Sequence, residues 1–151
     1  MPFDQTKDIL NHARKFHRRL SVFYEDLKEV AEKERTRALL DYLSRHETYL
    51  DESLAKFQEV VSENVLDTFL NYKADTANVS AITDFEISDE MTVDDVVAAA
   101  MHFDALLIKF YGDMARKTNS TKVREIFENL LVMEQHEQME LSKQTLELAN
   151  I

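Results

Sequence analysis

Hydrophobic residues recur along this chain at spacings of three and four, which is the period of an amphipathic α-helix with one buried face. The first stretch shows the pattern, with apolar positions at Ile9, Ala13, Phe16, Leu20, Phe23, Leu27 and Val30. Together, four such stretches predict helices over about residues 5–32 and 34–61, from residue 92 onward, and from residue 122 to near the end. One glycine and one proline in 151 residues leave few breaks in these helices, so the chain is predicted to be all-α.

The same helical hairpin occurs twice in the chain. The first helix of one copy matches the first helix of the other over residues 16–27 and 103–114. The matched pairs are Phe16 with Phe103, Leu20 with Leu107, Phe23 with Phe110, Tyr24 with Tyr111, Asp26 with Asp113 and Leu27 with Met114. Further along each copy, His46–Glu47 corresponds to His136–Glu137. A repeat of this length indicates one supersecondary unit used twice. Two hairpins that bury their apolar faces against each other form a four-helix bundle.

The connection between the two hairpins is long. We expect one domain over residues 1–151, made of hairpins at 5–61 and 92–149 with a crossover at 62–91. A connection of this length can travel along the bundle, which allows the second and third helices to run parallel. A short helix is predicted within it over Val65–Leu70.

Local signals place two helix boundaries. Thr92 and Asp95 have the spacing of an N-terminal capping box, so the third helix is expected to begin there. The second copy turns at Thr118–Thr121, a cluster of residues that favours turns over helix. By equivalence, the turn of the first hairpin is expected near Glu32–Arg35.

The composition narrows the classes of partner. The net charge of −11 argues against a nucleic-acid partner and against anionic membrane surfaces. The absence of cysteine excludes disulfides and thiolate metal sites. No apolar run approaches about 18 residues and the N-terminus lacks a signal pattern, so we expect a cytoplasmic protein. Surface apolar residues such as Val22, Ile108 and Leu131 favour a homodimer.

Carboxyl and imidazole groups interrupt the apolar seams at similar heights in all four helices. Glu47 lies on the second seam and Glu134 and Glu137 lie on the fourth, while Asp104 and His17 stand beside core aromatic residues of the third and first. A carboxylate in a bundle core is costly unless it is paired, protonated or bound to a metal. A carboxylate cluster around a divalent cation is one low-energy arrangement.

These groups also have interpretations that involve no metal. His17 and Asp104 can lie on the rim of the seam, in contact with water. His46 and His136 flank the two glutamates and can either pack at the surface or join a metal shell. Tyr24 is interpreted as a core aromatic residue rather than a redox residue.

The duplicated hairpin, the Phe-Tyr signature of its first helix and the long crossover resemble the ferritin-like superfamily, closest to its rubrerythrin-like branch. The resemblance covers nearly the whole chain and implies two metal ions, held by a Glu from the first and third helices and by Glu-x-x-His from the second and fourth. In the first helix, seven residues before Tyr24, stands His17 instead of Glu. In the third, seven residues before Tyr111, stands Asp104.

The motifs of the second and fourth helices also depart from the family pattern. Glu47 fits the first position of the second helix's motif, but Leu50, which cannot ligate a metal, stands three residues later. Glu137 fits the fourth helix's motif, with Glu140 in place of the histidine.

Two functions follow as hypotheses. The first is a protein that binds iron or manganese for metal handling or for oxygen or peroxide chemistry, with His17, Glu47, Asp104 and Glu137 as first ligands. Further ligand candidates are Glu134, Glu140, His46 and His136. The second is a non-catalytic bundle with a vestigial site, which acts by oligomerisation or by binding a partner, and Leu50 favours it. A metal-free enzyme has no supporting motif, since the sequence shows no nucleophile–base pairing and no phosphate-binding glycine loop.

Overall fold

The computed structural model describes residues 4–70, 79–86 and 90–149, and four long helices account for most of them. These helices are α1 (Thr6–Val30), α2 (Glu34–Val60), α5 (Val93–Lys117) and α6 (Thr121–Ala149). The shorter elements are β1 (Asp4–Gln5), α3 (Glu63–Leu66), β2 (Phe69–Leu70) and α4 (Val79–Thr83). The prediction of an all-α bundle is confirmed.

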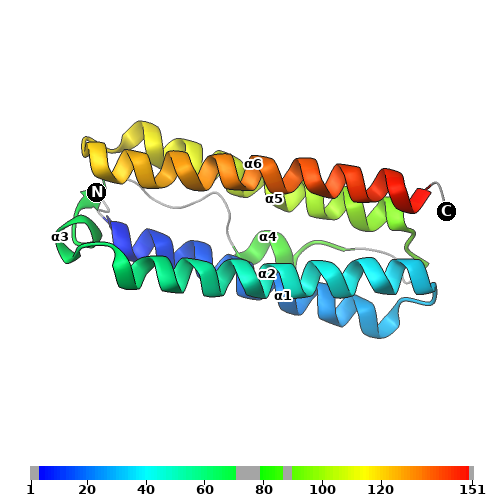
Figure 1. The fold of residues 1–151 in the computed structure, drawn as a ribbon. Helices are drawn as coiled ribbons and strands as arrows, with labels where there is room; N and C mark the ends of the chain where they lie inside the picture. The colour runs from blue at the N-terminus through cyan, green and yellow to red at the C-terminus, as the bar shows by residue number, and fades with distance from the viewer. Residues whose placement is uncertain (1–3, 71–78, 87–89, 150–151) are drawn as a thin grey trace.

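The helices form two antiparallel hairpins, α1 with α2 and α5 with α6. Figure 1 shows that α2 and α5 run in the same direction, because α3 and β2 lie at one end of the bundle and α5 begins at the other. The expected crossover between parallel second and third helices is therefore present.

The helix ends follow local capping chemistry. The Thr92 hydroxyl accepts a hydrogen bond from the backbone N–H of Asp95 at 3.2 Å, and the Asp95 carboxylate accepts one from the backbone N–H of Thr92 at 2.9 Å. The first turn spans residues 31–33, next to the predicted position.

The crossover starts differently from the prediction. Instead of one helix over Val65–Leu70, the chain forms α3 (Glu63–Leu66) and then β2. Ser62 caps α3 from one residue earlier, and β2 pairs antiparallel with β1, with Gln5 opposite Phe69. Pairing with the N-terminal strand gives the backbone of residues 69–70 hydrogen-bond partners that a helix would otherwise supply.

Large aromatic side chains fill the space between the two hairpins. Phe103 on α5 packs edge-on against Phe16 and Phe23 on α1, with ring centroids 6.4 Å and 5.4 Å apart. Phe16, Phe103 and Phe110 are fully buried. Val30, which the sequence pattern assigns to the seam, is exposed because α1 ends there.

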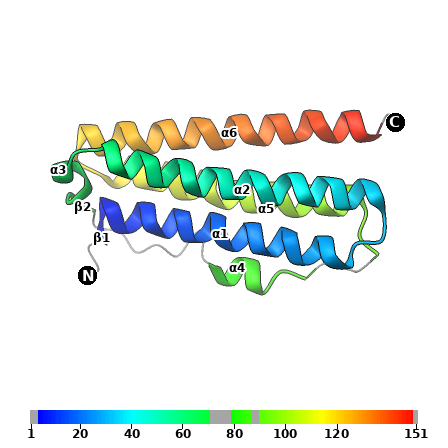
Figure 2. The same ribbon diagram turned by 60° about the horizontal axis from the view of Figure 1, so that its bottom comes forward.

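The crossover covers one side of the bundle. Phe85, which follows α4, packs against Phe23 and Phe103 with centroids 6.2 Å and 5.1 Å apart, and Ile82 is buried. Figure 2 shows α4 beside α1, on the side away from α6. Apolar side chains of the crossover therefore cover the core between α1 and α5.

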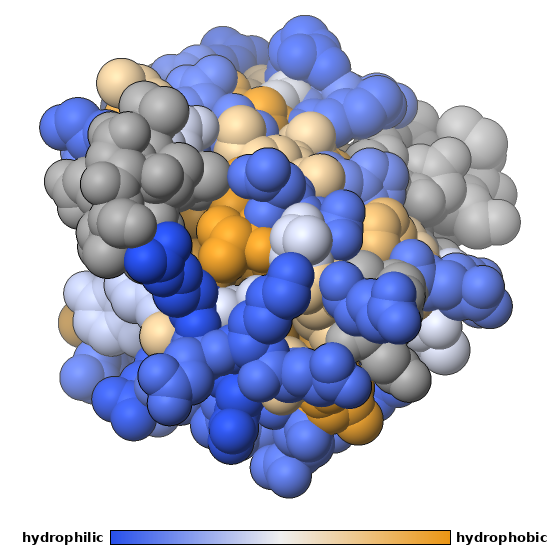
Figure 3. Space-filling model, turned by 90° about the vertical axis from the view of Figure 1, so that its right-hand side faces the viewer, coloured by the Kyte–Doolittle hydropathy of each residue, from blue (hydrophilic) through white to orange (hydrophobic). Residues whose placement is uncertain are grey.

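The end of the bundle seen in Figure 3 is mainly hydrophilic, with small apolar areas between polar side chains. None of the helices in the described ranges combines the length and the apolar content that crossing a bilayer requires.

Candidate metal centre

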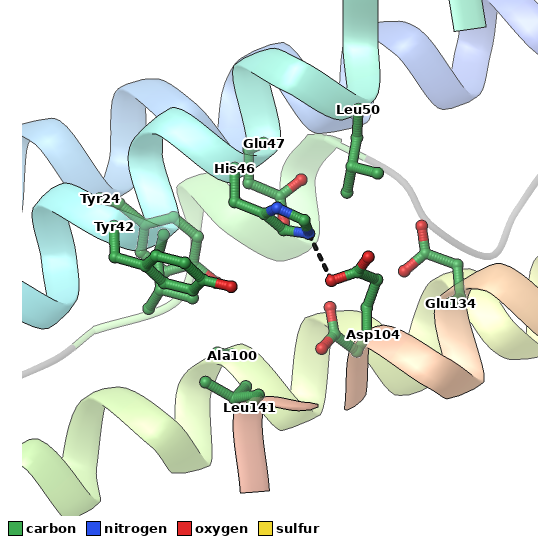
Figure 4. A pocket seen from close by; sticks show the side chains of 11 residues that line it. Tyr24, Tyr42, His46, Glu47, Leu50, Ala100, Asp104, Glu134 and Leu141 are labelled. Carbon is green, nitrogen blue, oxygen red and sulfur yellow. Dashed lines mark ion pairs between the residues drawn. The ribbon is translucent and has the colours of Figure 1, made fainter. Parts of the chain in front are cut away.

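A small cavity lies between α2, α5 and α6, and carboxyl and imidazole groups dominate its polar lining (Figure 4). These groups are His46 and Glu47 from α2, Asp104 from α5, and Glu134 and Glu137 from α6. The cavity volume is about 20 Å³, which is enough for about one water molecule. The described lining includes no lysine or arginine, so the acidic groups have no permanent cation beside them.

His17 adds α1 to this cluster. Its ring is fully buried, with Nδ1 2.5 Å from Oε2 of Glu47 and Nε2 3.4 Å from Oε1 of Glu134. All four long helices therefore contribute one or more polar groups at one level of the bundle, as the repeated interruptions predict. We name these six residues the core cluster; its members are His17, His46, Glu47, Asp104, Glu134 and Glu137.

Hydroxyl groups fix the register of α1 against α2 beside the core cluster. The Ser21 hydroxyl, one turn after His17, donates to the backbone carbonyl of Ser44 at 2.9 Å and lies 2.8 Å from the Thr48 hydroxyl. Ser44 returns a hydrogen bond from its hydroxyl to the backbone carbonyl of Ser21 at 3.1 Å. Because Thr48 adjoins Glu47, this network holds the two helices at the height where His17 meets Glu47.

Burial and mutual repulsion change the acidity of the carboxyl groups. Burial, and then the nearby Glu137 carboxylate, raise the pKa of Glu47 to about 8. Burial also raises the pKa values of Asp104 and Glu134 to about 8, with neighbouring carboxylates adding to the effect. The pKa of His17 is lowered by burial, although Glu134 opposes the shift. Without a cation, the core cluster therefore holds protons at neutral pH.

Three polar atoms of the core cluster are buried without a hydrogen-bond partner: Nε2 of His17, Nε2 of His46 and Oε1 of Glu134. Nε2 of His17 and Oε1 of Glu134 lie 3.4 Å apart but are not aligned as a hydrogen bond. Nε2 of His46 lies 2.6 Å from Oε2 of Glu137, a close ion pair whose N–H direction does not make an aligned hydrogen bond. Unpartnered buried polar atoms are rare and often mark a water or ion site.

The side chains are not arranged as a ready-made metal site. Within the described ranges, no three histidine or carboxylate groups converge closely enough to hold an ion. The contact between His17 and Glu47 and the contact between His46 and Glu137 each occupy two donor groups. An ion that enters this cavity would have to replace both contacts.

Comparisons with known proteins connect this arrangement to a fold. No family model matches the sequence, and no curated protein matches it either. The structure is similar to the crystal structure of a candidate ferritin-like diiron-carboxylate protein from Thermotoga maritima, with a TM-score of 0.66 and 16% sequence identity. The match covers 96% of this chain and 97% of that one.

The chain has the ferritin-like fold. The repeated hairpin and its crossover are those of this fold, while the rubrerythrin-like branch expected from the sequence is not distinguished by the match. At 16% identity the likeness concerns the fold, and the chemistry of the core cluster has to be argued from its own residues.

The cavity lining identifies which residues of α6 face the core cluster. Glu134 is 1% exposed and lines the cavity together with Glu137, which follows three residues later on the same face of α6. Glu140 and His136 lie outside the cavity, with side chains 43% and 67% exposed, and only reach 4.0 Å from each other. The pairing of Glu137 with Glu140 expected from the sequence is thus replaced by Glu134 with Glu137.

The structure also decides between burial and the rim for two candidates. His17 is fully buried and Asp104 is 8% exposed, so neither lies on a solvated rim. Leu50 lines the cavity and is buried, at the position where the family pattern has a histidine. Sequence reasoning missed Tyr42 and Leu141 as lining residues, although each lies one helical turn from a core-cluster residue on the same face.

Proposed function

We propose that this ferritin-like bundle binds divalent iron or manganese in the core cluster. The observation that carries the proposal is the group of four carboxyls beside His17, in which two buried polar atoms, Nε2 of His17 and Oε1 of Glu134, have no hydrogen-bond partner. A cation placed among them would give those atoms a partner and would favour the ionised carboxylates, which burial and then mutual repulsion disfavour.

The donor set suits these metals. Dimetal ferritin-like sites use four carboxylates and two imidazoles. The core cluster offers four carboxyls and the His17 imidazole as ligands, while its second imidazole, that of His46, pairs with Glu137. Four ionised carboxylates balance the charge of two dications. Oxygen and nitrogen donors suit iron and manganese without choosing between them.

The residues assigned to hold the metal are His17, Glu47, Asp104, Glu134 and Glu137. Bound iron or manganese would supply Lewis-acid and one-electron redox chemistry. The protein would supply a site without bulk water, since Glu47 and Glu134 are 4% and 1% exposed. The cavity of about 20 Å³ has room for a water-sized molecule, which favours metal handling or chemistry on oxygen or peroxide over an organic substrate.

One observation favours the second candidate function, a bundle with a vestigial site. Leu50 places an apolar side chain in the cavity where a ligand would help most, and it is 2% exposed. In that case the fold would act by oligomerisation or by binding a partner, and the core cluster would be a protonated remnant.

Thermal melting with and without metal tests the proposal. Manganese(II), or iron(II) without oxygen, should raise the melting temperature of the wild type, because a ligand present at about 100 times its Kd stabilises by about 2.7 kcal/mol. For a chain of this size, that corresponds to roughly 5–10 °C. Glu134→Gln should lose the shift, while the matched control Glu140→Gln, outside the cavity, should keep it. A wild type that melts at the same temperature with and without metal would favour the vestigial site.

A further inference from the structure

The six members of the core cluster lie at two depths. The side chains of His17, Glu47 and Glu134 are 0%, 5% and 1% exposed and Asp104 is 8% exposed, whereas the side chains of His46 and Glu137 are 20% and 23% exposed. The second pair therefore lies between the deep carboxyls and solvent. The opposite side of the bundle is covered by the crossover through Phe85 and Ile82. A cation that reaches the deep groups has its shortest route past His46 and Glu137.

His46 spans this opening. Figure 4 shows its ring extending from α2 across the cavity, with the ion pair drawn to a carboxylate on the opposite side. The contact joins Nε2 of His46 on α2 to Oε2 of Glu137 on α6 at 2.6 Å. It is a link between the two hairpins on the side that the crossover leaves uncovered.

Two tyrosine rings hold the imidazole from its own helix. Tyr42 stacks on His46 with a centroid distance of 5.8 Å and an interplanar angle of 5°, and Tyr49 stacks at 6.2 Å and 26°. Tyr49 is 62% exposed, so its ring extends the stack outward to the surface. A His46 ring that swings away from Glu137 thus finds an aromatic surface on the solvent side.

We propose that His46 is the gate of the core cluster: it closes the cavity by pairing with Glu137, and it opens it by moving toward Tyr49. The proposal rests on the proposed function, since a gate requires a cation that passes. In the closed state the imidazole occupies the carboxylate of Glu137. When it opens, that carboxylate is free to take an incoming cation. His46 therefore controls the rate at which a cation enters, and the deep residues supply its ligands.

The duplication supplies a matched control. His136 is the repeat equivalent of His46, directly before Glu137 as His46 is before Glu47. Its side chain is 67% exposed and does not line the cavity. Replacing either histidine removes the same chemical group from the same position of a repeated motif, so only the location differs.

The test measures cobalt(II) binding and release by stopped-flow absorbance on the full chain, with release started by excess chelator. In His46→Ala we expect the association rate constant to rise about tenfold, which is about 1.4 kcal/mol of barrier, and the Kd to be no weaker than that of the wild type, because the cation no longer displaces the imidazole from Glu137. In His136→Ala both constants should equal those of the wild type. An unchanged or slower association rate with a weaker Kd in His46→Ala would overturn the proposal, because that is the behaviour of a metal ligand.

A second variant protects the test against misfolding. Tyr49→Ala removes a mostly exposed ring that stacks on His46 and does not line the cavity. It should lower the association rate constant, because the open imidazole loses the ring toward which it moves, and an association rate constant identical to that of the wild type would contradict the assigned role of the stack. If the wild type binds no cobalt(II), iron(II) or manganese(II), the proposed function itself fails, and the gate fails with it. A wild type that binds metal and a His46→Ala variant with unchanged rates reject the gate alone.

Discussion

Nδ1 of His17 lies 2.5 Å from Oε2 of Glu47, and both side chains are buried. The repeat places Asp104 and Glu137 in the equivalent positions of the second hairpin. One hairpin thus pairs an imidazole with a carboxyl, while the other has a carboxyl at both positions, and burial, followed by Glu47 and Glu137, raises the pKa of Asp104. The second half of the core cluster needs a proton or a cation to relieve this repulsion.

The contact between His17 and Glu47 should appear as an energetic coupling in the metal-free protein. Glu47→Leu removes a desolvated carboxyl beside Leu43 and Leu50, which stabilises, but it leaves Nδ1 of His17 unpartnered, at a cost of about 1–3 kcal/mol. His17→Leu should likewise leave Glu47 unpaired. Urea unfolding of both single variants and the double variant should give a coupling energy of about 1–3 kcal/mol. Additive effects would show that the two groups do not depend on each other.

The metal-free protein should become less stable as the pH rises from 6.5 to 8. Glu47 and Glu134 have ordinary pKa values of 4.5 and folded pKa values of about 8, so their stabilising contribution is complete below 4.5 and is lost as the pH rises through 8. His17 has an ordinary pKa of 6.5 and a lowered folded pKa, so its own effect falls below this window.

Urea denaturation in chelator at several pH values measures this dependence. The slope should be on the order of 1 kcal/mol per pH unit for each carboxyl that holds a proton in the folded state. Glu134→Gln should reduce this slope by the contribution of one carboxyl. Stability that rises between pH 6.5 and 8 would mean that the carboxyls are already ionised in the fold.

Restoring the missing histidine should strengthen metal binding. Leu50→His recreates Glu-x-x-His from Glu47, on the face of α2 that lines the cavity. We expect manganese(II) affinity to rise by at least about tenfold, or 1.4 kcal/mol, while the metal-free variant loses about 1–3 kcal/mol for a buried polar group. Leu54→His is the control, since Leu54 is equally buried one turn later and does not line this cavity. Equal affinity in both variants would place the metal elsewhere.

The chain is still expected to form a homodimer. Of the surface residues named from the sequence, Val22 is 46% exposed, whereas Ile108 and Leu131 are half-buried, and larger exposures occur at Val132 and Met139 on α6. Such residues favour a second apolar interface. Light scattering at micromolar concentration should give twice the mass of one 17.6 kDa chain, and the mass of a single chain would reject the dimer.

The fold followed from the sequence because its signals are local and repeated. Seam residues such as Phe16 and Phe103 reveal the helical period and the duplication, and the capping box at Thr92 fixes a boundary within one turn. The strand pair between Gln5 and Phe69 was not predicted, because pairing of segments more than 60 residues apart leaves no local pattern.

The candidate site was predicted only in part. Helical spacing assigns Glu134 and Glu137 to the α6 seam, whereas the motif of the family that the sequence resembles points to Glu140. The packing of α6 against α5 buries Glu134 and leaves Glu140 outside the cavity. The burial of His17 beside a core phenylalanine likewise depends on how the hairpins are rotated against each other. Helical drift over several turns makes such rotations invisible to a periodic pattern.

The most direct test of metal binding in the core cluster is elemental analysis of the protein purified without added metal, beside Glu47→Leu prepared in the same way. The account predicts iron or manganese in stoichiometric amount in the wild type and its loss in Glu47→Leu, whose helical circular dichroism should be unchanged. A wild type free of both metals, with no melting shift in millimolar iron(II) or manganese(II) and with a more stable Glu47→Leu variant, would contradict it.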